Sequence, residues 1–291
     1  ALIIGKTNLD QFATGLVGVR SPYPVPRNAF DPSRVPGGSS SGSAIAVAQG
    51  IVPVALGTDT AGSGRIPAGL NDLVGLKPSL GAVSTRGVLP ACRTLDCVSV
   101  FARTPDDAWR TYEVLRGFDA KDAYSRPVPA EAPASAPALK AIGLPAAKDR
   151  HFFGDTLMAD AFDASLRLLP PLVDATAEVD LDPFLAVARL LYEGPWVAER
   201  HAAMRAFLAT NADDVHPVTR QIVGAAGRFS ATDAFEGLYR LAELRRATEA
   251  VWTRVDALVV PTCPIFPTLA ELEADPIGPN SRLGTYTNFV N

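Results

Sequence analysis

Two short segments of small residues contain the side chains best suited to covalent chemistry. Residues 37–44 read GGSSSGSA, and residues 57–67 read GTDTAGSGRIP. A loop of small residues lets backbone N–H groups converge on one point, because no bulky side chain obstructs them. A serine at the end of such a loop can attack a carbonyl carbon while the preceding N–H groups stabilise the oxyanion. The two segments therefore suggest acyl transfer at a serine.

Two other interpretations of these segments stay open. Gly-rich and Ser-rich loops also bind phosphate, although neither G-x-x-x-x-G-K-[ST] nor a G-x-G-x-x-G after a strand is present. A plain helix cap and turn would explain one segment, but not both in this order. The G-x-S-x-G elbow of other serine hydrolases is absent, because Ala61 stands where its first glycine would be.

The histidines and cysteines add no recognisable site. Neither a Ser-His-Asp triad nor a metal pair is indicated by the spacing of His151, His201 and His216, so we expect solvated or capping histidines. An odd, sparse cysteine count gives no disulfide framework, which indicates reduced thiols in or near the core. These thiols are Cys92, Cys97 and Cys263.

Composition limits the partners that we expect. The 291 residues are 47% apolar and 20% charged, as in an ordinary folded domain with a sizeable core. The net charge of -4 comes without a Lys/Arg block, so we expect no nucleic-acid partner. No apolar run is long enough to span a bilayer, so we expect no membrane partner. The expected compartment is the cytoplasm.

The pattern of strands and helices predicts an α/β fold in which one mixed β-sheet is covered by helices on both faces. Residues 1–4 are expected to form a buried strand, and the Pro- and Ala-rich residues 127–137 a surface crossover within one domain. The other expected strands are residues 51–56, 139–144 and 256–260. One expected helix covers residues 44–49, with the preceding serines as its cap and Gly50 as its stop. The other expected helices are residues 104–117, 155–169, 184–207 with a break at Gly194-Pro195, 215–226 and 231–255.

The two small-residue segments resemble the signature of the amidase signature family. The resemblance extends over nearly the whole chain and includes GKTNLD at residues 5–10 and GLKPS at residues 75–79. It implies a single mixed sheet between helices, a Ser-cis-Ser-Lys triad, and no metal or cofactor. Ser63 matches the nucleophile and Ser39 the cis-serine relay, 24 residues apart (63 − 39). Thr60, Ala61, Gly62 and Ser63 match the oxyanion-hole loop.

The triad lysine implied by this resemblance precedes the GKTN segment in the family and is not found in this chain. Lys6 and Lys77 match family positions outside the triad, so neither is expected to be the base. We therefore expect residues 1–291 to be a single amidase domain, incomplete at the N-terminus and the C-terminus. We also expect this chain to be inactive by itself, whereas the protein that contains it would be the enzyme.

Two further segments indicate the substrate. Residues 90–99 and 191–200 resemble the allophanate hydrolase branch of the family, in which a tyrosine and an arginine bind the substrate carboxylate. These match Tyr192 and Arg200, and arginine is the usual bidentate partner of a carboxylate. The resemblance implies a small anionic amide substrate, allophanate, which is hydrolysed to ammonia and carbon dioxide. A surface ion pair for Arg200 and core packing for Tyr192 are the alternatives.

Other functions stay open at this point. Another amidase of the family, or an amidotransferase subunit of the A type, would carry the same signature. A non-catalytic scaffold would be a function of another class, but it would not need both serines in a loop of small residues. Residues 281–288 also resemble the allophanate branch and are expected to close the pocket. The resemblance makes a homodimer possible.

Overall fold

The computed structural model describes residues 2–128 and 139–291. Most of the expected crossover at residues 127–137 lies outside them. Within the described residues, no helix is both long and apolar enough to cross a membrane. The helices are α1 (Ser41–Ala48), α2 (Ile66–Gly69), α3 (Pro105–Leu115), α4 (Thr156–Leu166), α5 (Asp182–Glu193), α6 (Trp196–Asn211), α7 (Pro217–Gly224), α8 (Ala231–Glu249), α9 (Leu269–Ala274) and α10 (Gly278–Leu283). The strands are β1 (Val54–Asp59), β2 (Val74–Leu76), β3 (Cys97–Ala102), β4 (Ala141–Pro145), β5 (Ala175–Val179) and β6 (Ala257–Leu258).

An antiparallel sheet of order β1-β3-β2 lies between two helices. Successive side chains of a strand point to opposite faces of its sheet. On β3, Phe101 lies in a buried cluster with Val47 of α1. Its neighbours Val100 and Ala102 lie in another cluster with Ala108 of α3. The two helices therefore cover opposite faces of this sheet, as the sequence predicts.

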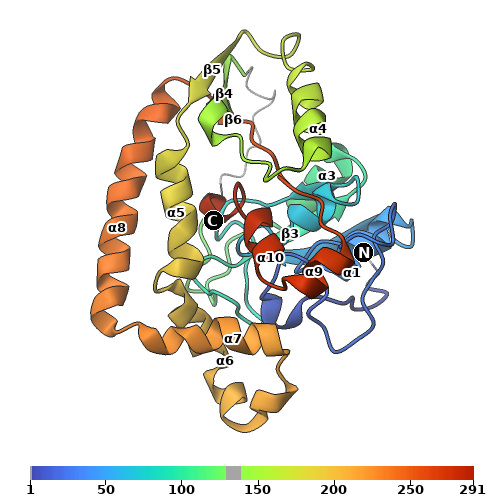
Figure 1. Ribbon diagram of the computed structural model, residues 1–291, viewed down its shortest axis with the longest axis vertical. Helices are drawn as coiled ribbons and strands as arrows, with labels where there is room; N and C mark the ends of the chain where they lie inside the picture. The colour runs from blue at the N-terminus through green and yellow to red at the C-terminus, as the bar shows by residue number, and fades with distance from the viewer. Residues whose placement is uncertain (1, 129–138) are drawn as a thin grey trace.

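A parallel sheet of order β5-β4-β6 forms the second part of the fold. Its core includes Val179, Phe184 of α5 and Tyr286. Helices α5 and α8 lie side by side along the flank of the molecule (Figure 1). The α/β class is confirmed. The described strands nevertheless form two sheets instead of one mixed sheet, because no strand of one sheet pairs with a strand of the other.

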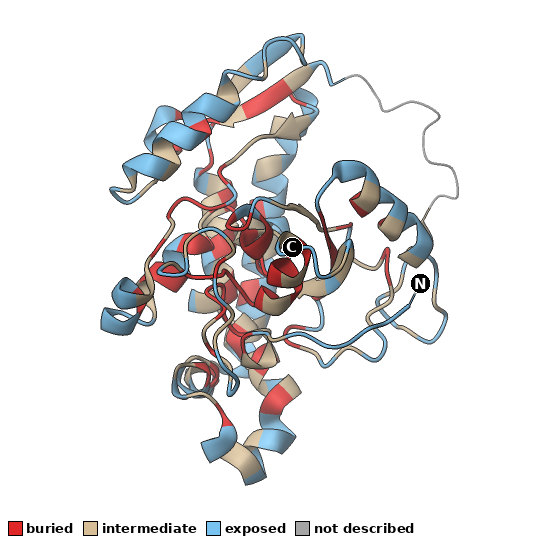
Figure 2. Ribbon diagram, turned by 90° about the vertical axis from the view of Figure 1, so that its right-hand side faces the viewer, coloured by how far each residue is buried: buried red, intermediate tan, exposed pale blue. Residues whose placement is uncertain are grey.

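Several expected boundaries shift, and one expected strand is wrong. Residues 2–4 pair with no strand of the described chain, and the Ile3 side chain is 91% exposed. Figure 2 shows the segment next to the N-terminus as exposed. The strand expected at residues 51–56 begins only at Val54, because Pro53 lacks the N–H that a ladder needs. The start of α3 agrees with the sequence, since the Thr104 side chain accepts from the Asp107 N–H.

The three cysteines are buried and unpaired, as the sequence predicts. Burial raises the pKa of Cys97 to about 11, and it also raises the pKa of Cys92 and Cys263. The thiolate, which is the reactive form, is therefore scarce at neutral pH.

We expect iodoacetamide to leave all three cysteines unmodified in the native protein and to modify them once urea unfolds it, because burial blocks access and suppresses the thiolate. Peptide mass spectrometry resolves the three sites. Modification of any of them in the native protein at the rate seen in urea would contradict the packing described above.

Candidate active site

The two small-residue segments lie side by side, as the acyl-transfer interpretation requires. Ser40 Oγ donates to the Thr58 carbonyl and accepts from the Thr58 N–H, both at 3.1 Å. One turn along α1, Ser43 Oγ donates to the Leu56 carbonyl at 2.8 Å. These bonds attach the start of α1 to β1. The loop that follows β1 therefore begins beside the Ser-rich segment.

A single buried carboxylate shapes that loop, which we call the serine loop (residues 60–64). Asp59 Oδ1 accepts from the Gly62 N–H at 2.8 Å, and Oδ2 accepts from the Gly64 N–H at 3.1 Å. The Arg65 guanidinium donates to both oxygens at 2.9 Å. Burial pushes the pKa of Asp59 upward, but the charges of Arg65 and Lys77 and these hydrogen bonds outweigh it, so the pKa lies below its usual range. The carboxylate thus stays ionised and holds the loop closed.

The C-terminal segment, residues 287–291, also donates hydrogen bonds to Asp59 and the serine loop. Thr287 Oγ1 donates to the Ala61 carbonyl at 2.7 Å, and Asn291 Nδ2 donates to the Asp59 carbonyl at 2.8 Å. Gly62 has a φ of 131°, and a Cβ there would overlap the Thr287 side chain. A residue with a side chain would therefore be strained at position 62. The expectation that residues 281–288 close a pocket stays a prediction.

The amides of the serine loop do not all have the same role. All four residues from Thr60 to Ser63 match the oxyanion-hole loop of the family. The Gly62 N–H, however, donates to Asp59 and is directed toward that carboxylate. The amides of Thr60, Ala61 and Ser63 remain as candidate donors to an oxyanion.

The candidate nucleophile and relay are both buried. Ser63 is 2% exposed, and its hydroxyl donates to the Gly15 carbonyl at 3.5 Å, a long contact. Ser39 is fully buried, and its hydroxyl has no hydrogen-bond partner in the described chain. The Gly38-Ser39 peptide bond is cis, which agrees with the cis-serine that the resemblance implies. Each hydroxyl is therefore free of a strong competing bond, and no hydrogen bond joins the two serines within residues 2–128.

A second buried carboxylate organises the segment that faces both serines, which we call the Asp10 segment (residues 10–20). Asp10 accepts from the N–H groups of Gly18 at 2.9 Å and Arg20 at 2.8 Å, and its own N–H donates to the Ser39 carbonyl at 2.9 Å. Burial raises the pKa of Asp10 and lowers that of Arg20, while the attraction between the two charges opposes both shifts. The Asp10 segment is thereby fixed against the cis peptide.

Tyr192 and Arg200 come together as the sequence predicts. Helix α5 ends at Glu193 and α6 begins at Trp196, so the Gly194-Pro195 break turns both side chains to one place. Arg200 is 1% exposed, and its guanidinium donates to Tyr192 Oη at 3.3 Å and lies 5.3 Å from the centre of the tyrosine ring. The surface ion pair considered for Arg200 is therefore wrong.

The Arg200 guanidinium has weak partners for a buried charge. It donates to the Ala13 carbonyl at 3.4 Å and to Thr14 Oγ1 at 3.3 Å, and its Nε has no partner in the described chain. No carboxylate of the described residues pairs with it. A buried cation without a counter-ion is costly, and a bound anion would offset that cost.

Sequence reasoning missed a carboxylate that connects the serine loop to its surroundings. Asp96 accepts from Thr60 Oγ1 at 2.6 Å and from the N–H groups of Ala91 at 2.9 Å and Cys92 at 3.0 Å. With Arg93 it also lines a cavity of about 280 Å³. Neither candidate serine lines this cavity.

The two lysines that the sequence singled out have different surroundings. Lys6 is exposed. Lys77 is mostly buried, and its Nζ donates to the Pro78 carbonyl at 2.9 Å. Burial lowers the pKa of Lys77, whereas the neighbouring Cys97 and Asp59 oppose the shift. No hydrogen bond joins Lys77 to either serine in the part of the chain that the structure describes. It stands on the Asp59 side of the loop, in keeping with a role outside the triad.

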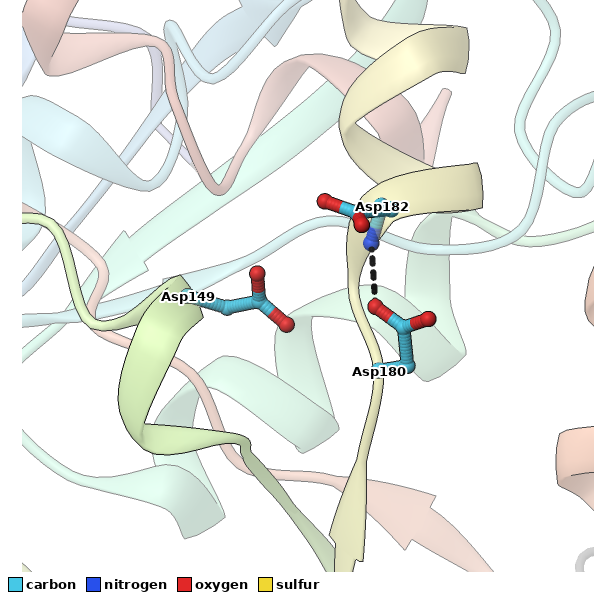
Figure 3. A group of neighbouring side chains, drawn as sticks. All are labelled: Asp149, Asp180 and Asp182. Carbon is cyan, nitrogen blue, oxygen red and sulfur yellow. Dashed lines mark hydrogen bonds between the residues drawn. The ribbon is translucent and has the colours of Figure 1, made fainter.

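An acidic cluster elsewhere could be mistaken for a metal site. Asp149, Asp180 and Asp182 lie close together at the start of α5, where the Asp182 N–H donates to Asp180 at 3.1 Å (Figure 3). Lys148 Nζ donates to all three carboxylates at 2.7 to 3.0 Å. The ammonium group offsets one of the three negative charges and connects all three side chains, so we interpret the cluster as a cap on the β5–α5 connection.

Comparison with known proteins gives a family match over the whole chain. The amidase family model matches residues 1–291. A urea amidolyase of Lachancea kluyveri is 47% identical over 100% of this chain, which corresponds to 16% of that protein. The solved structure of an S177A allophanate hydrolase of Kluyveromyces lactis superposes with a TM-score of 0.93 at 46% identity, over 100% of this chain and 48% of that one. The A-type subunit of glutamyl-tRNA(Gln) amidotransferase from Thermotoga maritima superposes with a TM-score of 0.80 at 25% identity, over 99% of this chain and 64% of that one.

The chain thus spans about one sixth of the urea amidolyase, at 16%, and about half of the allophanate hydrolase, at 48%. Both matches cover the whole of this chain, so they include the serine loop and the α5–α6 pair. The activity of those longer proteins as a whole is a proposal for the protein that contains this chain.

We expect Asp59→Asn to lower the free energy of unfolding by about 3 kcal/mol near neutral pH, because it removes the charge that pairs with Arg65. Since the folded-state pKa of Asp59 is depressed, its contribution is fully present above the ordinary aspartate pKa and is lost as the pH falls toward the folded value. The difference in free energy of unfolding between wild type and Asp59→Asn should therefore become smaller at acid pH.

Urea unfolding followed by circular dichroism measures this difference. The matched control is Asp174→Asn, which changes an exposed aspartate and should shift the free energy by less than about 0.5 kcal/mol. Equal unfolding midpoints for the two variants would show that Asp59 does not hold the loop.

Proposed function

Because the chain belongs to the amidase signature family, we propose that the protein containing it hydrolyses the amide of allophanate, with Ser63 as nucleophile. The observation that carries the substrate choice is the buried Arg200 guanidinium, which has no carboxylate partner in the described chain. A substrate carboxylate would supply the missing charge and the acceptor for Nε. The names of the similar proteins, urea amidolyase and allophanate hydrolase, support the same choice.

Arg200 and Ser63 both contact the Asp10 segment. Arg200 donates to the Ala13 carbonyl at 3.4 Å, and Ser63 donates to the Gly15 carbonyl at 3.5 Å. Two residues of extended chain span at most about 7 Å, so the guanidinium and the Ser63 hydroxyl lie within about 14 Å of each other. The carboxylate-binding group and the nucleophile are therefore anchored on the same short segment.

The proposed reaction proceeds through an acyl-enzyme. Ser63 Oγ bonds to the carbon of the terminal amide, and its proton passes through Ser39 to the lysine base that the family resemblance implies. The oxyanion accepts hydrogen bonds from the free amides of the serine loop. The C–N bond then breaks, and ammonia leaves with the relayed proton. Water attacks the acyl group, and the released N-carboxycarbamate decomposes to ammonia and carbon dioxide.

Other proposals differ in the amide that is cut. The similarity to the A-type subunit of an amidotransferase makes glutamine hydrolysis the second candidate. That reaction would not require a buried arginine for a carboxylate next to the scissile amide. The expectations of a homodimer, of a cytoplasmic location, and of no turnover by residues 1–291 alone stay predictions.

We expect Ser63→Ala in the full-length protein to lower the rate of ammonia release from allophanate by at least ~10³-fold, because it removes the nucleophile. Ser165→Ala, which changes an exposed serine of α4, is the control and should retain full activity. A Ser63→Ala variant as active as this control would contradict the proposed mechanism. Turnover of glutamine or a simple amide, but not of allophanate, would agree with the amidase family and would exclude allophanate as the substrate.

We expect Arg200→Ala to lower kcat/KM for allophanate by ~10- to 100-fold, which corresponds to one lost charge-assisted hydrogen-bonded contact. Arg200→Lys keeps the charge but not the bidentate geometry, so it should restore only part of the loss. Steady-state kinetics of ammonia release separates the two variants. If Arg200→Ala affected a neutral amide as strongly as allophanate, the arginine would not be the carboxylate-binding group.

A further inference from the structure

We propose that Glu199 is a positioning residue that orients Arg200 toward the substrate carboxylate, from a turn that Asp96 holds in place. This inference rests on the proposed function and deepens it. Glu199 is the residue immediately before Arg200 in the first turn of α6. Neither the spacing of Tyr192 and Arg200 nor the signature segments point to it.

Both oxygens of the Glu199 carboxylate accept hydrogen bonds from one neighbouring turn, which we call the Cys92 turn (residues 91–96). Oε1 accepts from the Thr94 N–H at 2.8 Å, and Oε2 accepts from Thr94 Oγ1 at 2.8 Å and from Cys92 Sγ at 3.0 Å. Three donors on one carboxylate fix its side chain in a single orientation. Glu199 therefore attaches the start of α6 to the Cys92 turn.

This attachment determines where Arg200 points. Adjacent residues on an α-helix project about 100° apart around the axis, at 3.6 residues per turn. Fixing Glu199 on one side prevents the first turn of α6 from rotating. Arg200 is then held over the Tyr192 ring, with its Nε unpaired in the described chain.

The Cys92 turn is itself attached to the serine loop. Asp96 accepts from the N–H of Cys92 and from Thr60 Oγ1, the first side chain of that loop. A continuous path of hydrogen bonds thus runs from α6 through Glu199, the Cys92 turn and Asp96 to Thr60. The bonds from Asp96 to Ala91, Cys92 and Thr60 do not involve Glu199, so they keep the Cys92 turn and the serine loop in place when Glu199 is removed.

Cys92 can act as a donor in this path because it stays a thiol. Burial raises the pKa of Cys92, and the nearby Glu199 and Asp96 carboxylates act in the same direction, against the opposing charge of Arg200. A thiolate would repel Glu199. The thiol instead donates a weak hydrogen bond to it at 3.0 Å.

If Glu199 has only a structural role, its removal should affect the substrates in a different way from removal of a positioning residue. If the carboxylate only stabilised the Cys92 turn, its loss would reduce activity on every amide by the same factor. If it acts through Arg200, its loss weakens binding of an anionic substrate and has a small effect on a neutral one. It should also have little effect once Arg200 is already absent, because coupled residues are not additive.

The test compares allophanate with biuret, a neutral amide of the same size, in the full-length protein. We expect Glu199→Ala to raise KM for allophanate ~10-fold while kcat changes less, as for the loss of one charge-assisted contact. For biuret, kcat/KM, or its inhibition constant if turnover is too slow, should change less than about 3-fold. In an Arg200→Ala background the same substitution should change KM for allophanate less than about 2-fold.

Two further variants keep the test decisive. Glu193→Ala removes an exposed glutamate at the end of α5 and should leave both substrates unaffected. Glu199→Gln keeps one acceptor oxygen for Thr94, so its KM for allophanate should lie between those of wild type and Glu199→Ala. This variant is used in place of Glu199→Ala if the latter does not fold. Equal losses on both substrates, or full additivity with Arg200→Ala, would overturn the inference. A wild-type protein inactive on allophanate would instead overturn the proposed function, and the inference with it.

Discussion

The ionised carboxylate of Asp59 is the constraint on which the candidate site depends. It holds two amides of the serine loop and the Arg65 guanidinium at once. A carboxylate of this kind can close a tight loop of small residues, whose side chains offer little apolar surface to pack. The C-terminal segment adds its support to the same point through Thr287. Ser63 is thereby presented at the end of a loop whose shape is set by charge and not by apolar packing.

The Asp10 segment connects the remaining parts of the site. It contacts Ser39 through a backbone hydrogen bond, Ser63 through the Gly15 carbonyl, and Arg200 through Ala13. Two buried charges of opposite sign, Asp10 and Arg20, keep this segment in place at a cost in desolvation. The cost is consistent with a site in which the alignment of polar groups matters more than stability.

The sequence was sufficient where a local pattern determines the answer. The signature segments indicated Ser39 and Ser63 as candidates, and Gly194-Pro195 predicted the break that brings Tyr192 and Arg200 together. The sequence was insufficient where the contact is distant along the chain. Asp96 and Glu199 lie within the two segments that resemble the allophanate branch, but no local pattern gives them a role until the fold places them beside Thr60 and the Cys92 turn. The division into two sheets was also not predictable, because short strands do not specify which edges pair.

Covalent labelling of the full-length protein with a fluorophosphonate, followed by peptide mass spectrometry, identifies the nucleophilic serine. Such reagents modify serines that are activated as nucleophiles. We expect a single modified serine, Ser63, whose labelling is slowed by allophanate and lost in a Ser39→Ala variant. Labelling at another serine, or labelling of Ser63 at a rate that neither allophanate nor Ser39→Ala changes, would show that Ser63 is not the activated nucleophile.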